Sequence, residues 1–359
     1  MSNFMPRPTV QPWGRRNVNR QLSIILASIL PAALSLLLVL VTGFDSTLVV
    51  ITFFIPLQIV AASVVGWKVY GKRGIQDAIL IFFTVFFSAL VLVLLLSVLF
   101  SVIIDGLGAL SFHFFFQNNV YVSSTTSLEY GGVGHAIIGT LLIVAMTTIV
   151  AVPLGIAMAV YLTQSNSGHK GLVRTFTQAL SGLPSVVAGL FILAVMELTG
   201  LTRSGFTGAL ALFPLMLPTV ARVAEEALRL VPADLRLAAL ALGAPNYRAF
   251  FQVILPAAKS GIITALLLGL ARVIGETAPL IITTNANNST NLNPFSGGMA
   301  TLPTFVYNFI SSTYETAQSR AWGGALVLLI VVGILFGAAR LLTAPKSLKP
   351  KKIKIKRSK

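Results

Sequence analysis

The sequence predicts an all-α, polytopic membrane protein with about eight transmembrane helices, and three observations support that prediction. Hydrophobic residues make up 55% of the 359 residues and charged residues only 10%, far below the roughly 25% of soluble domains. Long apolar stretches recur along the chain, and positive charge alternates between the loops that join them. The composition excludes an ordinary soluble enzyme, a disordered chain and a nucleic-acid-binding globular domain.

Eight stretches approach the ~20 mainly apolar residues that a membrane helix needs. The sixth is the shortest and contains Pro214 and Pro218, which a membrane helix tolerates where neighbouring groups satisfy the freed carbonyls. In chain order, the expected spans are Leu22–Thr42, Leu48–Gly66, Ala78–Ile104, His135–Leu162, Ala179–Thr199, Gly205–Val220, Gly261–Thr283 and Trp322–Leu342.

The loop charges predict the orientation, because short cytoplasmic loops are enriched in Lys and Arg. One set of alternate loops, with the two termini, holds 23 of the 26 basic residues. The other set holds only Arg203 and Arg320, and Arg272 falls inside a span. Both termini are therefore expected in the cytoplasm and the protein in the plasma (inner) membrane. The tail, residues 343–359, is expected to be a basic cytoplasmic anchor attracted to anionic lipid.

The sequence contains no pattern that predicts a catalytic or metal site. Cysteine is absent, which excludes thiolate catalysis and thiolate metal sites, and the three histidines are too scattered for a metal cluster. Gly66-x4-Gly71-Lys72 resembles a phosphate-binding P-loop, but Arg73 follows it and a membrane span, not a strand, precedes it. We expect no catalytic residue, no metal and no cofactor on this chain.

The longest basic loop, residues 221–260, predicts two short helices. An Ala/Leu-rich helix runs up to Gly243, a residue suited to a helix C-terminus, and Pro245 follows where helices stop. Asn246 is expected to cap a second helix that carries Tyr247, Phe250 and Phe251. Two amphipathic helices either occupy a groove on a partner or lie on the membrane or on their own bundle.

Within this loop, Leu237-Ala-Ala-x3-Gly243 precedes Val253-x-Leu255-Pro256 by nine residues. The pattern resembles the E-A-A-x3-G-x9-I-x-L-P loop of ABC importer permeases, which docks a coupling helix into a cleft on the ATPase subunit. Leu237 occupies the family's glutamate position, so the contact made by that carboxylate is not implied here. The resemblance implies ATPase-coupling roles for Ala238, Ala239, Gly243, Ala244, Leu255 and Pro256.

Three further segments resemble permeases of the phosphate-specific importers, the PstA type. They are residues 132–140, 182–191 and 271–280, and Gly275-Glu276-Thr277-Ala278-Pro279 is the most specific. The resemblance covers about Ala78 to Leu342. It implies a six-helix, type I permease core over residues 76–342, preceded by an N-terminal segment with an added two-helix hairpin over residues 1–75.

The resemblance also implies partners. They are a homologous permease (PstC-like), two ATPase subunits (PstB-like) that hold ATP and Mg, and an extracytoplasmic phosphate-binding protein (PstS-like). The lipid bilayer is expected as surroundings and nucleic acid is not expected. The implied function is import of inorganic phosphate. The alternatives are a permease for another oxyanion, or a secondary anion transporter, for which the expected inverted repeat is not visible.

Arg272 and Glu276 are notable without any resemblance, because Arg272 is expected near mid-bilayer, one turn from Glu276 on one helix face. A charge there costs roughly 2.5–3.5 kcal/mol on insertion scales, so it faces a cavity or a partner. The guanidinium suits a tetrahedral oxyanion, whereas a buried Arg272–Glu276 pair would only fix helix packing. Thr277 adds a hydroxyl to this expected substrate pathway, although such threonines commonly bond their own backbone.

The predicted topology is testable with reporter fusions. A reporter active only in the cytoplasm, fused after Lys359, is expected to be active, whereas fusion within residues 105–134 is expected to be silent. Activity of the second fusion would contradict the eight-span topology.

Overall fold

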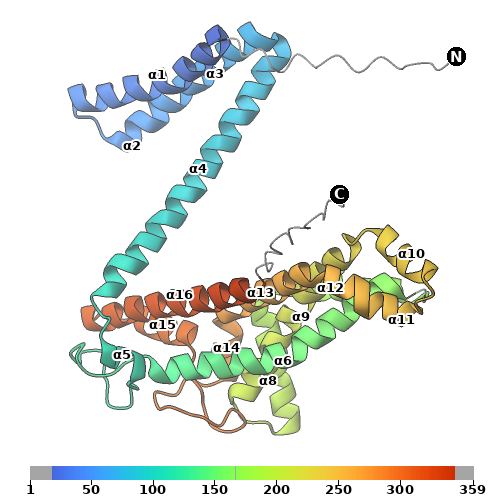
Figure 1. The fold of residues 1–359 in the computed structure, drawn as a ribbon. Helices are drawn as coiled ribbons and strands as arrows, with labels where there is room; N and C mark the ends of the chain where they lie inside the picture. The colour runs from blue at the N-terminus through green and yellow to red at the C-terminus, as the bar shows by residue number, and fades with distance from the viewer. Residues whose placement is uncertain (1–17, 166, 344–359) are drawn as a thin grey trace, which may run out of the picture. The chain divides into compact units, whose positions relative to one another are not determined.

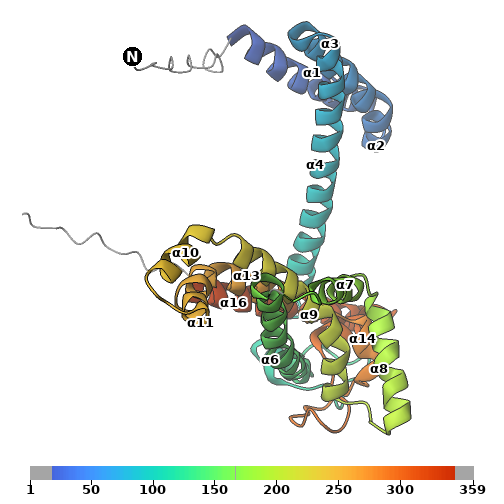
Figure 2. The ribbon, with the colours of Figure 1, turned by 90° about the vertical axis from the view of Figure 1, so that its right-hand side faces the viewer.

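The computed structural model describes residues 18–165 and 167–343, and every regular element within them is a helix (Figures 1 and 2). Helices satisfy all their backbone hydrogen bonds internally, as the hydrocarbon core requires. The predicted all-α class is confirmed. The chain divides into two compact units, Met1–Leu99 and Phe100–Lys359. Residues 75 and 76, between which the permease core was expected to begin, both lie in the helix α4 (Lys72–Leu107). The expected basic tail lies almost wholly outside the described residues.

Six helices in the described part are long and apolar enough to cross a membrane, and two bent helix pairs raise the number to eight. The six agree with six of the expected spans. They are α1 (Val18–Thr42), the continuous helix of α2 (Ser46–Val49), η2 (Val50–Phe54) and α3 (Ile55–Tyr70), then α4, α6 (Gly134–Gln164), α9 (Gly205–Arg229) and α16 (Glu315–Thr343).

The other two expected spans are not single straight helices, and the prediction was wrong there. Residues 179–181 belong to α7 (Lys170–Ser181), which meets α8 (Ser185–Thr199) at 102°. Pro184 explains this break, because it has no N–H and keeps the preceding residue out of helical conformation. The seventh expected span is divided into two helices, α13 (Lys259–Ile274) and α14 (Ala278–Thr283), which residues 275–277 separate.

Two wide, π-helical turns have a common cause. They are η2 in the first unit and η3 (Phe250–Ile254) in the second, and each ends two residues before a proline, Pro56 or Pro256. A proline ring collides with the carbonyl four residues earlier, and that residue lies inside the wide turn in both cases. The wider turn keeps the helix continuous past the proline.

The first unit is a helical hairpin of α1 against α3, followed by most of α4. Gln58 Nε2 donates to the Ala27 carbonyl over 3.0 Å and joins the two helices. Beyond Gly71, α4 begins so close to α3 that a Cβ at Gly66 would lie 2.2 Å from the Gly74 carbonyl oxygen. Most apolar side chains of this unit are exposed in the chain, as expected of helices that contact lipid.

The second unit is organised around α6 and α9, which form its most extensive helix pair. Small residues allow the close approach: a Cβ at Gly155 would lie 2.9 Å from Val220 Cγ1, and one at Gly269 of α13 would lie 2.7 Å from Val220 Cγ2. The surrounding core buries Ile143, Ala151, Leu212, Leu215, Met216, Val220 and Ala265. Both prolines of α9 lie within an uninterrupted helix that continues to Arg229, beyond the expected end at Val220.

A second cluster of buried side chains joins α5 (Phe112–Phe116) to α6, α15 (Leu302–Ile310) and α16. Arg320 was expected in an outer loop, and that assignment was wrong. It lies within α16 and is fully buried, and its guanidinium donates to the Ser127 and Tyr130 carbonyls over 2.6 and 3.0 Å. These two hydrogen bonds therefore hold the segment from Ser127 to Tyr130 against α16.

The packing of Gly139 makes a sharp prediction. A Cβ there would lie 2.0 Å from the Ala300 carbonyl oxygen, so Gly139→Ala must separate α6 from the segment before α15. We expect a loss of about 1–3 kcal/mol in stability, typical of overpacking, seen as earlier thermal unfolding of the purified protein. Gly333→Ala in α16 is the matched control, because a Cβ there meets nothing within 4 Å. Equal stability of the two variants would contradict the packing.

Candidate functional site

The loop expected to contact an ATPase folds at one end of the second unit (Figure 1). It comprises α10 (Ala233–Ala241), α11 (Asn246–Ala249), η3 and α12 (Leu255–Ala257). The expected Ala/Leu-rich helix before Gly243 is present as α10. The helix α9 ends at Arg229, and Pro232 then caps α10 as a separate helix. A proline at that position has no N–H to continue a helix and is preorganised to begin one.

Gly243 ends α10 as predicted. Its φ is +83°, the left-handed region, and a Cβ there would meet nothing within 4 Å. The Ala244 N–H donates to the Ala239 carbonyl and the Gly243 N–H to the Leu240 carbonyl, over 3.1 and 2.9 Å. This pair of bonds is the Schellman motif, which closes a helix with glycine in the left-handed conformation.

The second short helix has a different cap from the one predicted. Pro245 is the N-cap residue of α11, and Asn246 is already helical, so its side chain is free for another contact. Asn246 Oδ1 accepts a bond of 3.4 Å from an Arg236 guanidinium nitrogen, which links α11 to α10.

The loop has a buried face and an exposed face. Phe250, Ile254 and Ala258 join the main core of the second unit, and Leu255 packs partly against it. Ala239 and Ala249 are also buried, whereas Ala238 and Pro256 are exposed and Ala244 is half-buried. Large apolar side chains on the other face are exposed: Leu235, Leu237, Leu242, Tyr247 and Phe251. The loop is therefore anchored to the membrane unit while presenting an apolar surface outward.

The expected substrate-pathway residues lie at the break between α13 and α14. Arg272 is in the last turn of α13 and is exposed, and no ion pair or hydrogen bond to it is found among the described residues. Glu276 is half-buried and lies beyond the end of the helix at Ile274. The prediction that the two share one helix face was wrong, because α13 stops at Gly275.

The hydroxyls near this break are mostly committed to backbone groups, as expected for threonines in membrane helices. Thr283 and Thr284 are buried and donate to the Pro279 and Leu280 carbonyls, each over 2.8 Å. Thr277 is half-buried, and its bond to the Gly275 carbonyl is long, 3.5 Å. Thr277 is thus the least committed hydroxyl beside Arg272.

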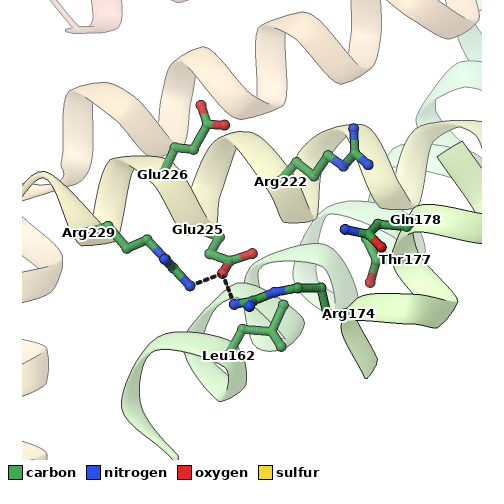
Figure 3. A pocket seen from close by; sticks show the side chains of 8 residues that line it. All are labelled: Leu162, Arg174, Thr177, Gln178, Arg222, Glu225, Glu226 and Arg229. Atoms are coloured by element: carbon green, nitrogen blue, oxygen red, sulfur yellow. Dashed lines mark hydrogen bonds and ion pairs between the residues drawn. The ribbon is translucent and has the colours of Figure 1, made fainter. Parts of the chain in front are cut away.

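One polar cluster was not predicted, and it lies between α7 and α9 (Figure 3). Glu225 Oε1 accepts from Arg174 over 3.0 Å and from Arg229 over 2.6 Å. One of the two contacts could have been predicted from the sequence, because Arg229 follows Glu225 at the helical spacing of four. The approach of Arg174, which lies 51 residues before Glu225 in the chain, depends on tertiary packing.

The left-handed turn at Gly243 makes the second structural prediction. Gly243→Val is expected to cost about 1–2 kcal/mol of backbone strain without any clash and to speed hydrogen exchange at the Ala244 amide. Gly243→Asn is the control, because asparagine tolerates this conformation. The resemblance extends the expectation to assembly, with less ATPase subunit retained by the valine variant. Unchanged exchange in the valine variant would contradict the assigned turn.

Residues 151–344 match the family described as "Binding-protein-dependent transport system inner membrane component". The phosphate transport system permease protein PstA 1 of Mycobacterium tuberculosis (strain CDC 1551 / Oshkosh) is 44% identical over 214 residues, 59% of this chain and 70% of the relative. The phosphate transport system permease protein PstA of Pasteurella multocida (strain Pm70) is 35% identical over 270 residues, 75% of this chain and 93% of the relative.

A solved structure of the MetNI methionine ABC transporter in an inward-facing conformation aligns with 59% of this chain and 92% of its own, at 18% identity and a TM-score of 0.45. The family match covers more than half of this chain, and the two relatives align over most of their own length. The chain therefore belongs to the family of binding-protein-dependent transport system inner membrane components.

Proposed function

We propose that this chain is the permease subunit of an ATP-driven importer of inorganic phosphate and forms half of the translocation pathway. The names of the two relatives support the substrate, since both are phosphate transport permeases that this chain matches over 70% and 93% of their length. Family membership favours an importer permease over a secondary anion transporter, because the family is that of binding-protein-dependent transport systems and the two relatives are named as phosphate transport system permeases. The observation that carries the proposal is that Arg272 has no ion pair or hydrogen bond among the described residues.

Arg272 is a charged side chain at the end of a membrane helix, and it has no acceptor among the described residues. A guanidinium within a membrane span needs water, a partner or a ligand. Its five fixed donors match the oxygens of a tetrahedral oxyanion and can engage two of them at once. We assign Arg272 as the residue that meets phosphate on the path, with the Thr277 hydroxyl as a second donor.

Glu276 has the same sign of charge as phosphate, so it cannot share a contact with the anion. Because α13 ends before Gly275, Glu276 lies outside the helix. The Glu276 backbone N–H donates to the Val273 carbonyl over 3.3 Å. We assign Glu276 as the residue that receives Arg272 once the anion leaves. Such an exchange would keep the arginine from holding phosphate too long, because the carboxylate offers it an alternative partner.

The 221–260 loop, called the coupling loop from here on, supports a role in contact with an ATPase subunit. We propose that its exposed apolar face, centred on α10 and α11, docks on an ATPase subunit, with Ala238, Ala239, Gly243, Ala244, Leu255 and Pro256 setting its shape. Burial of Phe250 and Ile254 in the main core would transmit movement of the docked loop to α9 and α13. A homologous permease would complete the path, and an extracytoplasmic binding protein would deliver phosphate. ATP and Mg would bind on the ATPase subunits.

Phosphate uptake per assembled complex tests this proposal. Arg272→Lys keeps the charge but loses the planar fork, so uptake is expected to fall by about tenfold or more, and Arg272→Gln is expected to abolish it. Arg203→Gln removes the same charge from an exposed loop position and is the control.

Two further measurements define the outcome. The double variant Arg272→Gln, Glu276→Gln is expected to remain inactive, because it still lacks the guanidinium that would bind phosphate. Recovery near the wild-type rate would refute the role of Arg272. Competition by sulfate or molybdate as strong as that by phosphate would favour the permease of another oxyanion.

A further inference from the structure

A polar hollow of about 280 Å³ lies between α7 and α9, beside the end of α6 (Figure 3). It is separate from the break that holds Arg272 and lies wholly within the second unit. Its lining is dominated by charged and amide side chains: Arg174, Gln178, Arg222, Glu225, Glu226 and Arg229. Leu162 and Thr177 complete it, and Thr177 is buried with its hydroxyl donating to the Val173 carbonyl over 2.8 Å.

The charges of this hollow are unbalanced. Arg174 and Arg229 share a single carboxylate oxygen of Glu225, so two cations are held by one anion. Arg222 has no ion-pair partner in the described part of the chain, and Figure 3 shows Glu226 pointing away from the shared contact. Three guanidinium groups and two carboxylates therefore line the hollow, an excess of one positive charge, and most of the guanidinium N–H donors have no acceptor among the described residues.

The surface of α7 is that expected of a helix at the depth of lipid headgroups. Leu172 and Phe176, four residues apart, are exposed apolar side chains, with exposed fractions of 72% and 55%. Arg174 and Gln178 form a parallel polar stripe, which lines the hollow. A helix with adjacent apolar and basic stripes lies in the membrane interface, and its 102° bend from α8 fits that orientation. The loop charges place this interface on the cytoplasmic side.

We propose that this hollow binds a phosphate group at the cytoplasmic face of the membrane, carried by an anionic lipid headgroup or present as a free phosphate ion. Arginine forks recognise phosphate oxygens in pairs. Glu225 binds Arg174 and Arg229 and competes with the ligand for them, and the unengaged Arg222 supplies the excess positive charge. Since α9 ends at Arg229 and α10 follows at Ala233, an occupant would brace α7 against the helix that leads into the coupling loop.

Native mass spectrometry of the full purified complex tests the proposal. The complex is held in phosphatidylcholine nanodiscs and titrated with phosphatidylglycerol or with inorganic phosphate. Arg222→Gln is expected to weaken binding about fivefold, the value of one interfacial charge. Glu225→Gln is expected to strengthen it by a similar factor, because it frees Arg174 and Arg229. Arg73→Gln, a cytoplasmic charge loss in the first unit, is the control and should change neither affinity.

The two ligand arms distinguish the source of the phosphate group. Charge-dependent binding of phosphatidylglycerol that inorganic phosphate does not displace identifies a lipid site, and the reverse identifies an ion site. The lipid arm does not depend on what the protein transports, so it remains informative if phosphate import is refuted. Thermal stability of each variant in phosphatidylcholine alone separates misfolding from lost binding.

Two results would overturn the proposal. One is an unchanged affinity for both ligands in Arg222→Gln. The other is weaker binding of both ligands by a stably folded Glu225→Gln protein, because it would show that the cluster only ties α7 to α9.

Discussion

The close packing of α6 against α9 is the constraint on which the second unit depends. It is possible because small residues stand where the helices cross, and Val220 of α9 fills the space above both Gly155 and Gly269. In lipid, such contacts replace the hydrophobic effect as the source of helix association. Besides α6, the helices α7, α8, α13 and α14 also pack against α9. The Thr207 hydroxyl donates to the Thr283 carbonyl of α14 over 2.8 Å, Glu225 binds α7, and the coupling loop begins where the helix ends.

Departures from regular helix occur where the protein needs a new direction or an accessible backbone. Pro184 separates α7 from α8, and Gly275 separates Arg272 from Glu276. At the coupling loop, Gly243 closes α10, and Pro256 widens the preceding turn so that Phe250 and Ile254 are buried while Phe251 remains exposed. Since unpaired backbone groups are costly in hydrocarbon, such breaks are restricted to protein-lined or interfacial positions.

The arginines of the second unit divide by what accepts their hydrogen bonds. Arg320 is buried and bonded to two loop carbonyls, so it serves the structure. Arg174 and Arg229 are held by a shared carboxylate, which fixes their geometry and leaves donors available. Arg272 has no acceptor among the described residues, which is why we propose it as the residue that meets phosphate. Arginine thus occurs in three different surroundings in this unit.

The sequence by itself determined the helical class, six of the membrane segments and the glycine that closes α10. Each depends on local chemistry, namely the length of the apolar stretches and the conformational freedom of Gly243. Only the tertiary structure decided the burial of Arg320 and the meeting of Arg174 with Glu225. Those features depend on carbonyls and carboxylates from distant parts of the chain, which linear spacing does not encode.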